Sequence, residues 1–144
     1  MTESRLPTGL ELGLGSYGSP LRVLVIGSSN YTPDMIKEVG EAGGLGVDVA
    51  RDPRDAIQRM QDQFYEVVVV DLPNPQMTAE GLYTYIGEVN PEQAERVVFL
   101  ANDLNDPSTL RFLTEAKRPF LTQPVDPHQV YDLMMRVGLA EVGD

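Results

Sequence analysis

The residue with the clearest opportunity for chemistry is Asp71, which ends the apolar run that opens the stretch VVVVDLPNPQM, residues 67–77. A buried β-branched strand that ends in an acid presents that acid at the edge of a sheet, where the sites of α/β proteins lie. Asp71 is therefore a candidate nucleophile or metal ligand. The alternative is a structural remnant of such a site, and the residues beside it must decide between the two.

Few other side chains could support catalysis or metal binding. The chain has no cysteine, which excludes thiol chemistry, disulfides and cysteine-based metal sites. Its only histidine, His128, falls in the first turn of the last predicted helix with no nucleophile at a recognisable spacing, so we expect it to be exposed and without a catalytic role. The stretch GSSNYTPD at 27–34 lacks the glycine spacing and the lysine of a phosphate-binding loop.

Charge and hydropathy exclude several classes of protein. The 144 residues carry a net charge of −11 with only 11 basic residues, which disfavours binding to nucleic acids and to anionic membranes. No apolar run approaches the roughly 18 residues of a membrane span, and no signal peptide opens the sequence. We therefore expect a cytoplasmic domain with neither a nucleic-acid nor a membrane partner.

Apolar runs alternate with helical patterns after residue 20. The short runs predict strands at 21–27, 46–52, 65–71, 95–101 and 118–123. The intervening patterns predict a helix that begins at Pro53 and others at 33–43, 78–90, 106–116 and 126–138. This alternation predicts an α/β fold, a five-stranded parallel sheet with helices on both faces in the (βα)5 flavodoxin-like arrangement.

Local signals predict how individual helices begin and which faces they bury. Thr32 before Pro33 predicts an N-cap followed by proline at the first helical position. In the helix over 78–90 the side chains of Leu82, Ile86 and Val89 share one face, which we expect to point into the core.

The segment before the first strand differs from the rest of the chain. It is rich in glycine and proline without sustained periodicity, which predicts a flexible arm or linker. An alternative is a short docking segment, because Leu10, Leu12 and Leu14 alternate as the side chains of a strand do. The expected divisions are an arm at 1–20, one domain at 21–140 and a tail at 141–144.

The carboxyl ends of parallel strands meet at one edge of the sheet, so residues at predicted strand ends should lie together. These residues are Gly27, Asp71, Ala101 and Gln123. We expect any functional site at this edge.

From residue 21 to about 140 the sequence resembles the receiver domain of response regulators in two-component signalling. The stretch 67–77 is similar to the family's phosphoacceptor strand and loop, with Asp71 as acceptor, proline four residues on, methionine six on and Ala79 at the small-residue position. RVVFLAND, 96–103, resembles the fourth strand. RPFLTQPVDPHQV, 118–130, resembles the segment that ordinarily reads aromatic-x-x-Lys-Pro, with Phe120 as the switch aromatic.

The departures from that family pattern concern the phosphorylation site. Where the family has an acidic pair that holds Mg²⁺ with the acceptor, this sequence has Gly27 and Ser28. Where the family has Thr or Ser at the end of the fourth strand and Lys at the end of the fifth, it has Ala101 and Gln123. Of the phosphorylation machinery only Asp71 remains, which implies a degenerate pseudo-receiver.

The missing groups are those that phosphoryl transfer depends on. The transition state spreads negative charge over the transferred oxygens, and metal and cationic side chains neutralise that charge. We therefore expect negligible phosphotransfer, no cofactor and no bound metal, and a direct hydrogen bond from Gln123 to Asp71. Mg²⁺ is expected only if Asp71 still accepts phosphate. Asp103 could supply a second carboxylate, but a solvated loop acid is the expectation.

The resemblance implies a protein–protein interaction module of bacterial signal transduction that is not an enzyme and does not depend on phosphorylation. Its partner would be a signalling protein such as a histidine kinase or an output protein, or a second copy in a homodimer. Two alternatives stay open: a conventional phospho-accepting receiver of a phosphorelay, switched at Asp71, and a small-molecule sensor that uses the strand-end cleft.

Receivers dock partners on the face formed by the fourth helix, fifth strand and fifth helix. Two adjacent methionines on the last helix are not expected both to face the core, so one should be exposed. Tyr83 and Tyr85 on the third helix are a second candidate surface. The candidates on the first face are Phe112, Phe120, Gln129, Tyr131, Met134 and Met135.

Overall fold

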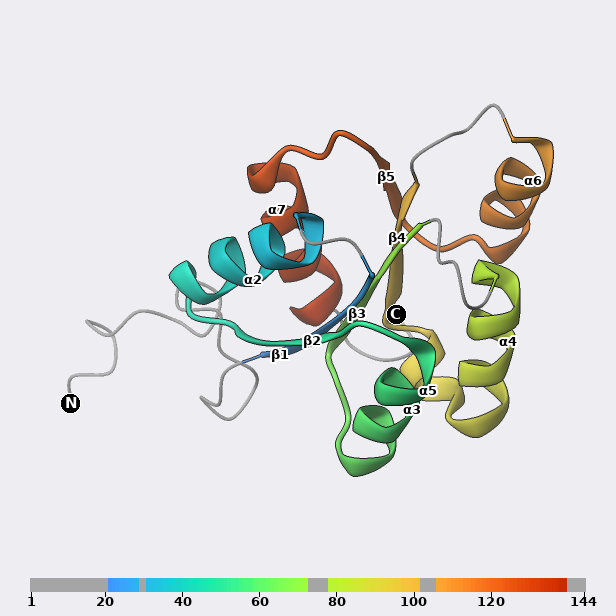
Figure 1. Ribbon diagram of the computed structural model, residues 1–144, viewed down its shortest axis with the longest axis horizontal. Coiled ribbons are helices and arrows are strands. Elements are labelled where there is room, and N and C mark those ends of the chain that lie inside the picture. The colour runs from blue at the N-terminus through green and yellow to red at the C-terminus, as the bar shows by residue number, and fades with distance from the viewer. Residues whose placement is uncertain (1–20, 29–30, 73–77, 102–105, 140–144) are drawn as a thin grey trace.

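The computed structural model of the chain describes residues 21–28, 31–72, 78–101 and 106–139. All strands run parallel in one sheet of order β2-β1-β3-β4-β5, as Figure 1 shows. The strands are β1 (Arg22–Ile26), β2 (Gly46–Ala50), β3 (Val67–Asp71), β4 (Val97–Ala101) and β5 (Phe120–Thr122). The predicted five-stranded parallel sheet is confirmed, with strands shorter by two or three residues than the apolar runs.

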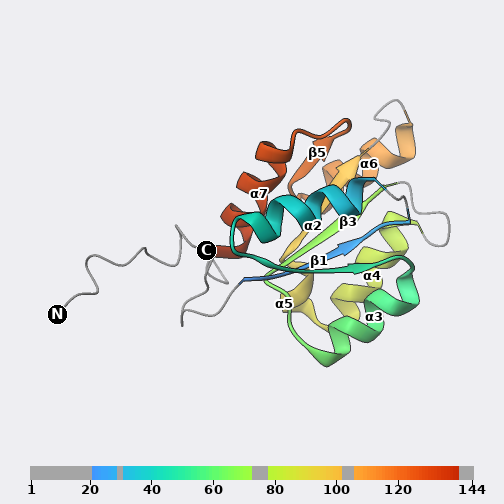
Figure 2. The ribbon, with the colours of Figure 1, turned by 60° about the vertical axis from the view of Figure 1, so that its left-hand side comes forward.

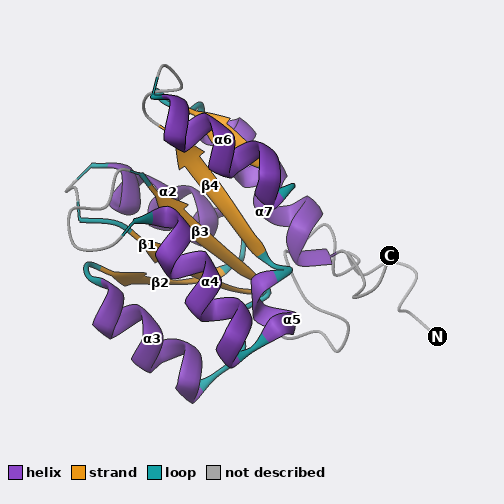
Figure 3. Ribbon diagram, turned by 90° about the vertical axis from the view of Figure 1, so that its right-hand side faces the viewer, coloured by secondary structure: helices purple, strands orange, loops and turns teal. Residues whose placement is uncertain are grey.

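Helices cover both faces of the sheet. On one face α2 (Thr32–Ala42) and α7 (Pro127–Leu139) lie side by side, which is clearest in Figure 2. The other face carries α3 (Pro53–Asp62), α4 (Ala79–Val89), the short α5 (Pro91–Ala94) and α6 (Pro107–Ala116), as Figure 3 shows. None of the helices in these ranges is long and apolar enough to cross a membrane.

The core forms two apolar layers because successive strand residues point to opposite faces. In β1, Val23 and Val25 pack under α2 and α7, whereas Leu24 and Ile26 pack under the helices of the other face. β3 lies at the centre with every residue buried, which is why its run of valines shows no alternation.

Three local expectations are wrong. Thr32 lies inside α2, because the helix begins one residue earlier than the proline suggests. The N-cap is Tyr31, whose side chain makes no capping hydrogen bond. Val89 is 54% exposed, since α4 ends there and Asn90 starts a new turn. That turn is α5, capped by Asn90, and no helix was predicted there. The expected arm at 1–20 and tail at 141–144 fall outside the described residues.

Candidate functional site at the carboxyl edge of the sheet

The residues expected at the strand ends do lie along one edge of the sheet. Asp71 is the last residue of β3 and pairs with Leu100, one residue before Ala101 at the end of β4. The backbone N–H of Gln123 donates to the carbonyl of Ala101 over 2.8 Å and so extends the β4–β5 ladder by one residue. Gly27 follows β1 and donates its N–H to the carbonyl of Ala50. The predicted grouping is confirmed.

A hydrogen bond links Asp71 to Gln123, as the sequence predicts. Nε2 of Gln123 donates to Oδ1 of Asp71 over 2.6 Å and also lies 3.3 Å from the carbonyl oxygen of Leu72. Asp71 is 7% exposed, so this contact forms where little water competes for the carboxylate. The amide thus occupies one oxygen of the candidate acceptor.

The second oxygen of Asp71 lies over Gly27. A Cβ added at Gly27 would be 3.1 Å from Oδ2 and 2.9 Å from Cβ of Asp71, closer than Cβ atoms approach other atoms without a shift. On its other side the same Cβ would meet Cγ of Pro33 at 3.1 Å. Glycine is therefore required by the close approach of β3 and α2, and there is no room for a side chain at this position.

Pro33 is a part of this site that sequence reasoning missed. It is buried in the first turn of α2, next to Thr32, which is also buried. In the sequence, a proline at this place indicates only a helix start, because its missing N–H and fixed φ suit the first helical turn. Its ring also fills the space beside Gly27, a contact that needs the tertiary structure to be seen.

These residues do not suit Mg²⁺. The ion prefers near-octahedral oxygen coordination with carboxylate ligands. Asp71 is the only carboxylate that the described strand ends supply, Ala101 is fully buried and offers no side-chain oxygen, and the side chain space at Gly27 is filled. Within the described ranges, no three His, Cys, Asp or Glu side chains are grouped to hold a metal. Pro73, Pro75, Met77 and Asp103 lie outside these ranges.

The candidate interface face divides into exposed and buried residues. Phe120 is 36% exposed and Gln129 is exposed, as a docking surface requires. Phe112 is half-buried and stacks edge-to-face on Phe99, with ring centroids 5.2 Å apart. Tyr131 is half-buried and donates its hydroxyl to the carbonyl of Gly43 over 3.2 Å. Of these residues, Phe120 and Gln129 are the ones open to a partner.

The expectation that one of the two adjacent methionines is exposed is wrong. Met134 and Met135 are both buried, and both belong to the core layer under α2 and α7. Neighbouring side chains on a helix diverge by only about 100°, so a wide apolar stripe can bury both. Neither residue is available to a partner.

The second candidate surface also divides. Tyr83 is half-buried and stacks edge-to-face on Phe99, with centroids 5.9 Å apart. Tyr85 is 36% exposed.

His128 is exposed, and its N–H donates to Oδ1 of Asp126, which caps α7.

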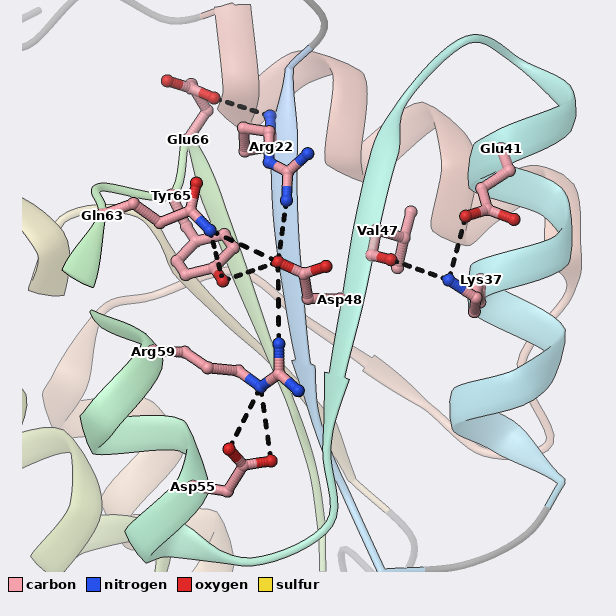
Figure 4. Close-up of polar contacts among 10 residues, drawn as sticks. All are labelled: Arg22, Lys37, Glu41, Val47, Asp48, Asp55, Arg59, Gln63, Tyr65 and Glu66. Atoms are coloured by element: carbon pink, nitrogen blue, oxygen red, sulfur yellow. Dashed lines mark hydrogen bonds and ion pairs between the residues drawn. The ribbon is translucent and has the colours of Figure 1, made fainter. Parts of the chain in front are cut away.

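A second carboxylate, Asp48 on β2, gathers a polar cluster that sequence reasoning did not find (Figure 4). Its Oδ2 accepts from Tyr65 Oη at 2.7 Å and from Arg22 Nη2 at 2.8 Å, and lies 3.9 Å from Arg59 Nη1. Burial raises the pKa of Asp48, but the Tyr65 hydrogen bond and the two arginine charges outweigh it, so the pKa is lower than usual. The cluster holds an ionised aspartate.

Solved structures of the same fold are response regulators. CheY4, a chemotaxis response regulator of Vibrio cholerae, is 20% identical with a TM-score of 0.68, covering 81% of this chain and 97% of that one. A putative response regulator from Chloroflexus aurantiacus is 17% identical with a TM-score of 0.73, covering 83% and 98%. The receiver domain of Francisella response regulator 1452 is 20% identical with a TM-score of 0.70, covering 81% and 95%.

No protein-family model matches the sequence, and no curated protein matches it. At identities of 16–20% the likeness to solved structures establishes the fold, which is the CheY-like receiver fold over about four-fifths of the chain.

Proposed function

We propose that this chain is a receiver-like module that signals through protein–protein contacts without being phosphorylated. The proposal rests mainly on how the surrounding residues enclose the Asp71 carboxylate. Gln123 holds one carboxylate oxygen at 2.6 Å, and the other lies over a glycine that has no space for a Cβ. An acid held in this way serves as a structural contact between the ends of β3, β5 and β1.

Electrostatics support the same conclusion. A phosphoryl dianion that approaches the Asp71 carboxylate to 4 Å would be repelled by about 4 kcal/mol per pair of unit charges at an effective dielectric of 20. In receivers this repulsion is offset by Mg²⁺ and a lysine ammonium; here the residues do not suit the ion, and Gln123 brings an uncharged amide. Losing one preorganised electrostatic donor typically raises a barrier by about 3–4 kcal/mol.

The module would act by presenting a surface. It would be a non-enzymatic, cytoplasmic component of bacterial signalling, and the likeness of its fold to response regulators supports that context. The exposed Phe120, at the start of β5, and Gln129, on α7, supply the contact for a signalling protein or a second copy.

The phosphorylation half of the proposal is tested by intact-mass spectrometry and amide NMR. The wild-type chain and Asp71→Asn, which keeps an oxygen for the Gln123 hydrogen bond, are each incubated with Mg²⁺ and acetyl phosphate, then with Mg²⁺ and beryllium fluoride. We expect no phosphoryl adduct on either chain and the same small shifts at Ser28, Leu72 and Gln123 in both. An adduct on wild type alone would establish the conventional phospho-switch at Asp71 instead.

The interaction half is tested by affinity capture with four baits: wild type, Asp71→Asn, Phe120→Ala and the control Val89→Ala. We expect the same partner from wild type, Asp71→Asn and Val89→Ala, and severalfold less from Phe120→Ala. A partner retained only after acetyl phosphate treatment, or lost with Asp71→Asn, would contradict a phosphorylation-independent contact.

A further inference from the structure

A groove with mostly apolar walls is lined by residues of α3, α4 and α5. Figure 3 shows these helices on the same face of the sheet. The groove holds about 270 Å³ of empty space, part of it open to solvent. Tyr85 and Val89 are exposed along it. The apolar lining comes from Ile57 and Met60 of α3 and Tyr85, Ile86 and Val89 of α4. This surface is separate from Asp71 and from the β5–α7 face.

The α5 end of the groove is linked by hydrogen bonds to the start of β1. Gln93, which lines that end, receives a hydrogen bond from the N–H of Tyr65 at 3.0 Å and donates to its carbonyl at 2.7 Å. Glu66, which follows Tyr65, donates its backbone N–H to the carbonyl of Arg22, and its side-chain carboxylate accepts from the backbone N–H of Arg22. Hydrogen bonds through Tyr65 and Glu66 therefore connect Gln93 to Arg22 at the start of β1.

The chain before Leu21 is long enough to reach the groove. Leu21 comes seven positions after Leu14. An extended chain advances about 3.3 Å per position, or roughly 23 Å over this stretch. The helix α4 has 11 residues and is about 16 Å long. The stretch LELGL, residues 10–14, can thus lie along the groove while still joined to β1.

The composition of this stretch matches the groove. In an extended chain Leu10, Leu12 and Leu14 point to the same side, which makes a narrow apolar edge. Residues 1–20 hold two glutamates and one arginine, a charge of −1, which leaves −10 of the total of −11 for the remaining 124 residues.

Charge also disfavours a second copy in the groove. The exposed acids Asp62, Glu88 and Glu92 each adjoin a groove residue, and a second copy would bring another strongly acidic body against them. Residues 10–14 bring a single acid, Glu11, so the tethered segment is repelled far less than a second copy, and it acts at a high effective concentration.

We propose that residues 10–14 dock in the α3–α4 groove of the same chain and cover its apolar walls. The test is paramagnetic relaxation in the full-length protein. Because the chain has no cysteine, Thr8→Cys offers one site for a nitroxide spin label. The label should reduce the amide peak intensities of residues 57–61 and 85–90 severalfold, and leave those of α7 unchanged.

Two variants in the labelled background provide the contrast. Val89→Lys places a charge in the groove and should restore the peak intensities, whereas Leu110→Lys, at an exposed apolar residue of α6, should not. Both changes are at exposed positions, and the dispersion of the remaining amide peaks verifies that each variant is folded. Unchanged intensities at 57–61 and 85–90, or intensities that Val89→Lys leaves low, would overturn the proposal.

A mixed sample tests for a second copy. Spin-labelled chain without ¹⁵N is combined with unlabelled ¹⁵N chain, and we expect no loss of intensity in the groove. A loss there would show that the segment of another copy is the occupant and would overturn the intramolecular proposal. Neither result depends on phosphorylation of Asp71, so this proposal and the proposed function can fail independently.

Discussion

Asp48 and Asp71 are two aspartates on strands of one sheet that are held in different ways. Oδ2 of Asp48 is surrounded by a tyrosine hydroxyl and two arginines, at 2.7, 2.8 and 3.9 Å. Oδ1 of Asp71 accepts from the uncharged amide of Gln123, and its other oxygen lies over Gly27. Asp48 is an ionic hub that joins β1, β2, α3 and the segment before β3, whereas Asp71 is packed into a closed strand end.

An acid at the expected place is therefore not by itself a reactive site. Reactivity at Asp71 would need open space and opposite charge around its oxygens, and the structure has a neutral donor and a close backbone contact there. Positively charged side chains gather instead around Asp48 on β2. Figure 4 shows Arg22 and Arg59 pointing toward its carboxylate.

The largest effect is expected from Gly27→Asp, which restores an acid at the position where receivers carry one. Its Cβ would lie 2.9 Å from Cβ of Asp71, and its charge would repel that carboxylate. We expect a loss of about 3 kcal/mol or more in the free energy of unfolding, measured by urea denaturation. Ser28→Asp, at the exposed neighbour, should change it by less than about 0.5 kcal/mol. A stable Gly27→Asp variant would show that the strand end opens readily.

Removal of the Asp48 carboxylate should lower the free energy of unfolding by less than Gly27→Asp does. Asp48→Ala leaves the Tyr65 hydroxyl and the Arg22 guanidinium without their common acceptor, so we expect a loss of about 2 kcal/mol. The control is Asp34→Ala, which breaks an exposed ion pair with Arg51 and should cost less than about 1 kcal/mol. Equal losses in the two variants would mean that the cluster is no more than a surface ion pair.

Removal of the Gln123 amide should lower the free energy of unfolding by slightly less than removal of the Asp48 carboxylate. Gln123→Ala takes the 2.6 Å donor from the buried Asp71, and we expect a loss of about 1.5 kcal/mol. Gln129→Ala, at an exposed glutamine of α7, is the matched control and should be nearly neutral. If Gln123→Ala proved equally neutral, the carboxylate would not depend on this contact.

The smallest effect is the pH dependence that Asp48 contributes. Its pKa in the folded protein lies below the ordinary value of 3.8, so its stabilisation is complete above about pH 4 and is lost as the pH falls through the lower folded value. Urea midpoints measured from about pH 5 to about pH 3 should therefore fall more steeply for wild type than for Asp48→Asn. Parallel curves for the two chains would contradict an ionised hub.

Much of the fold could be predicted because its signals are local. The run VVVVD is buried throughout as β3, and Asp52 caps α3 by accepting from the N–H of Asp55 over 2.8 Å. The hydrogen bond between Gln123 and Asp71 could also be predicted, since the end of each parallel strand lies at the same edge. The errors came where a local pattern did not show where an element begins or ends, as at Thr32 and Val89.

The residue types at the sheet edge can be read from the sequence alone: one acid, a glycine, an alanine and a glutamine where metal ligands and a lysine would be needed. How closely these residues lie follows from the tertiary structure. The contact of Gly27 with Asp71 and Pro33, the hub at Asp48 and the groove between α3 and α4 each join residues distant in sequence. Such contacts depend on how twisted strands and helices pack, which no local pattern of residues specifies.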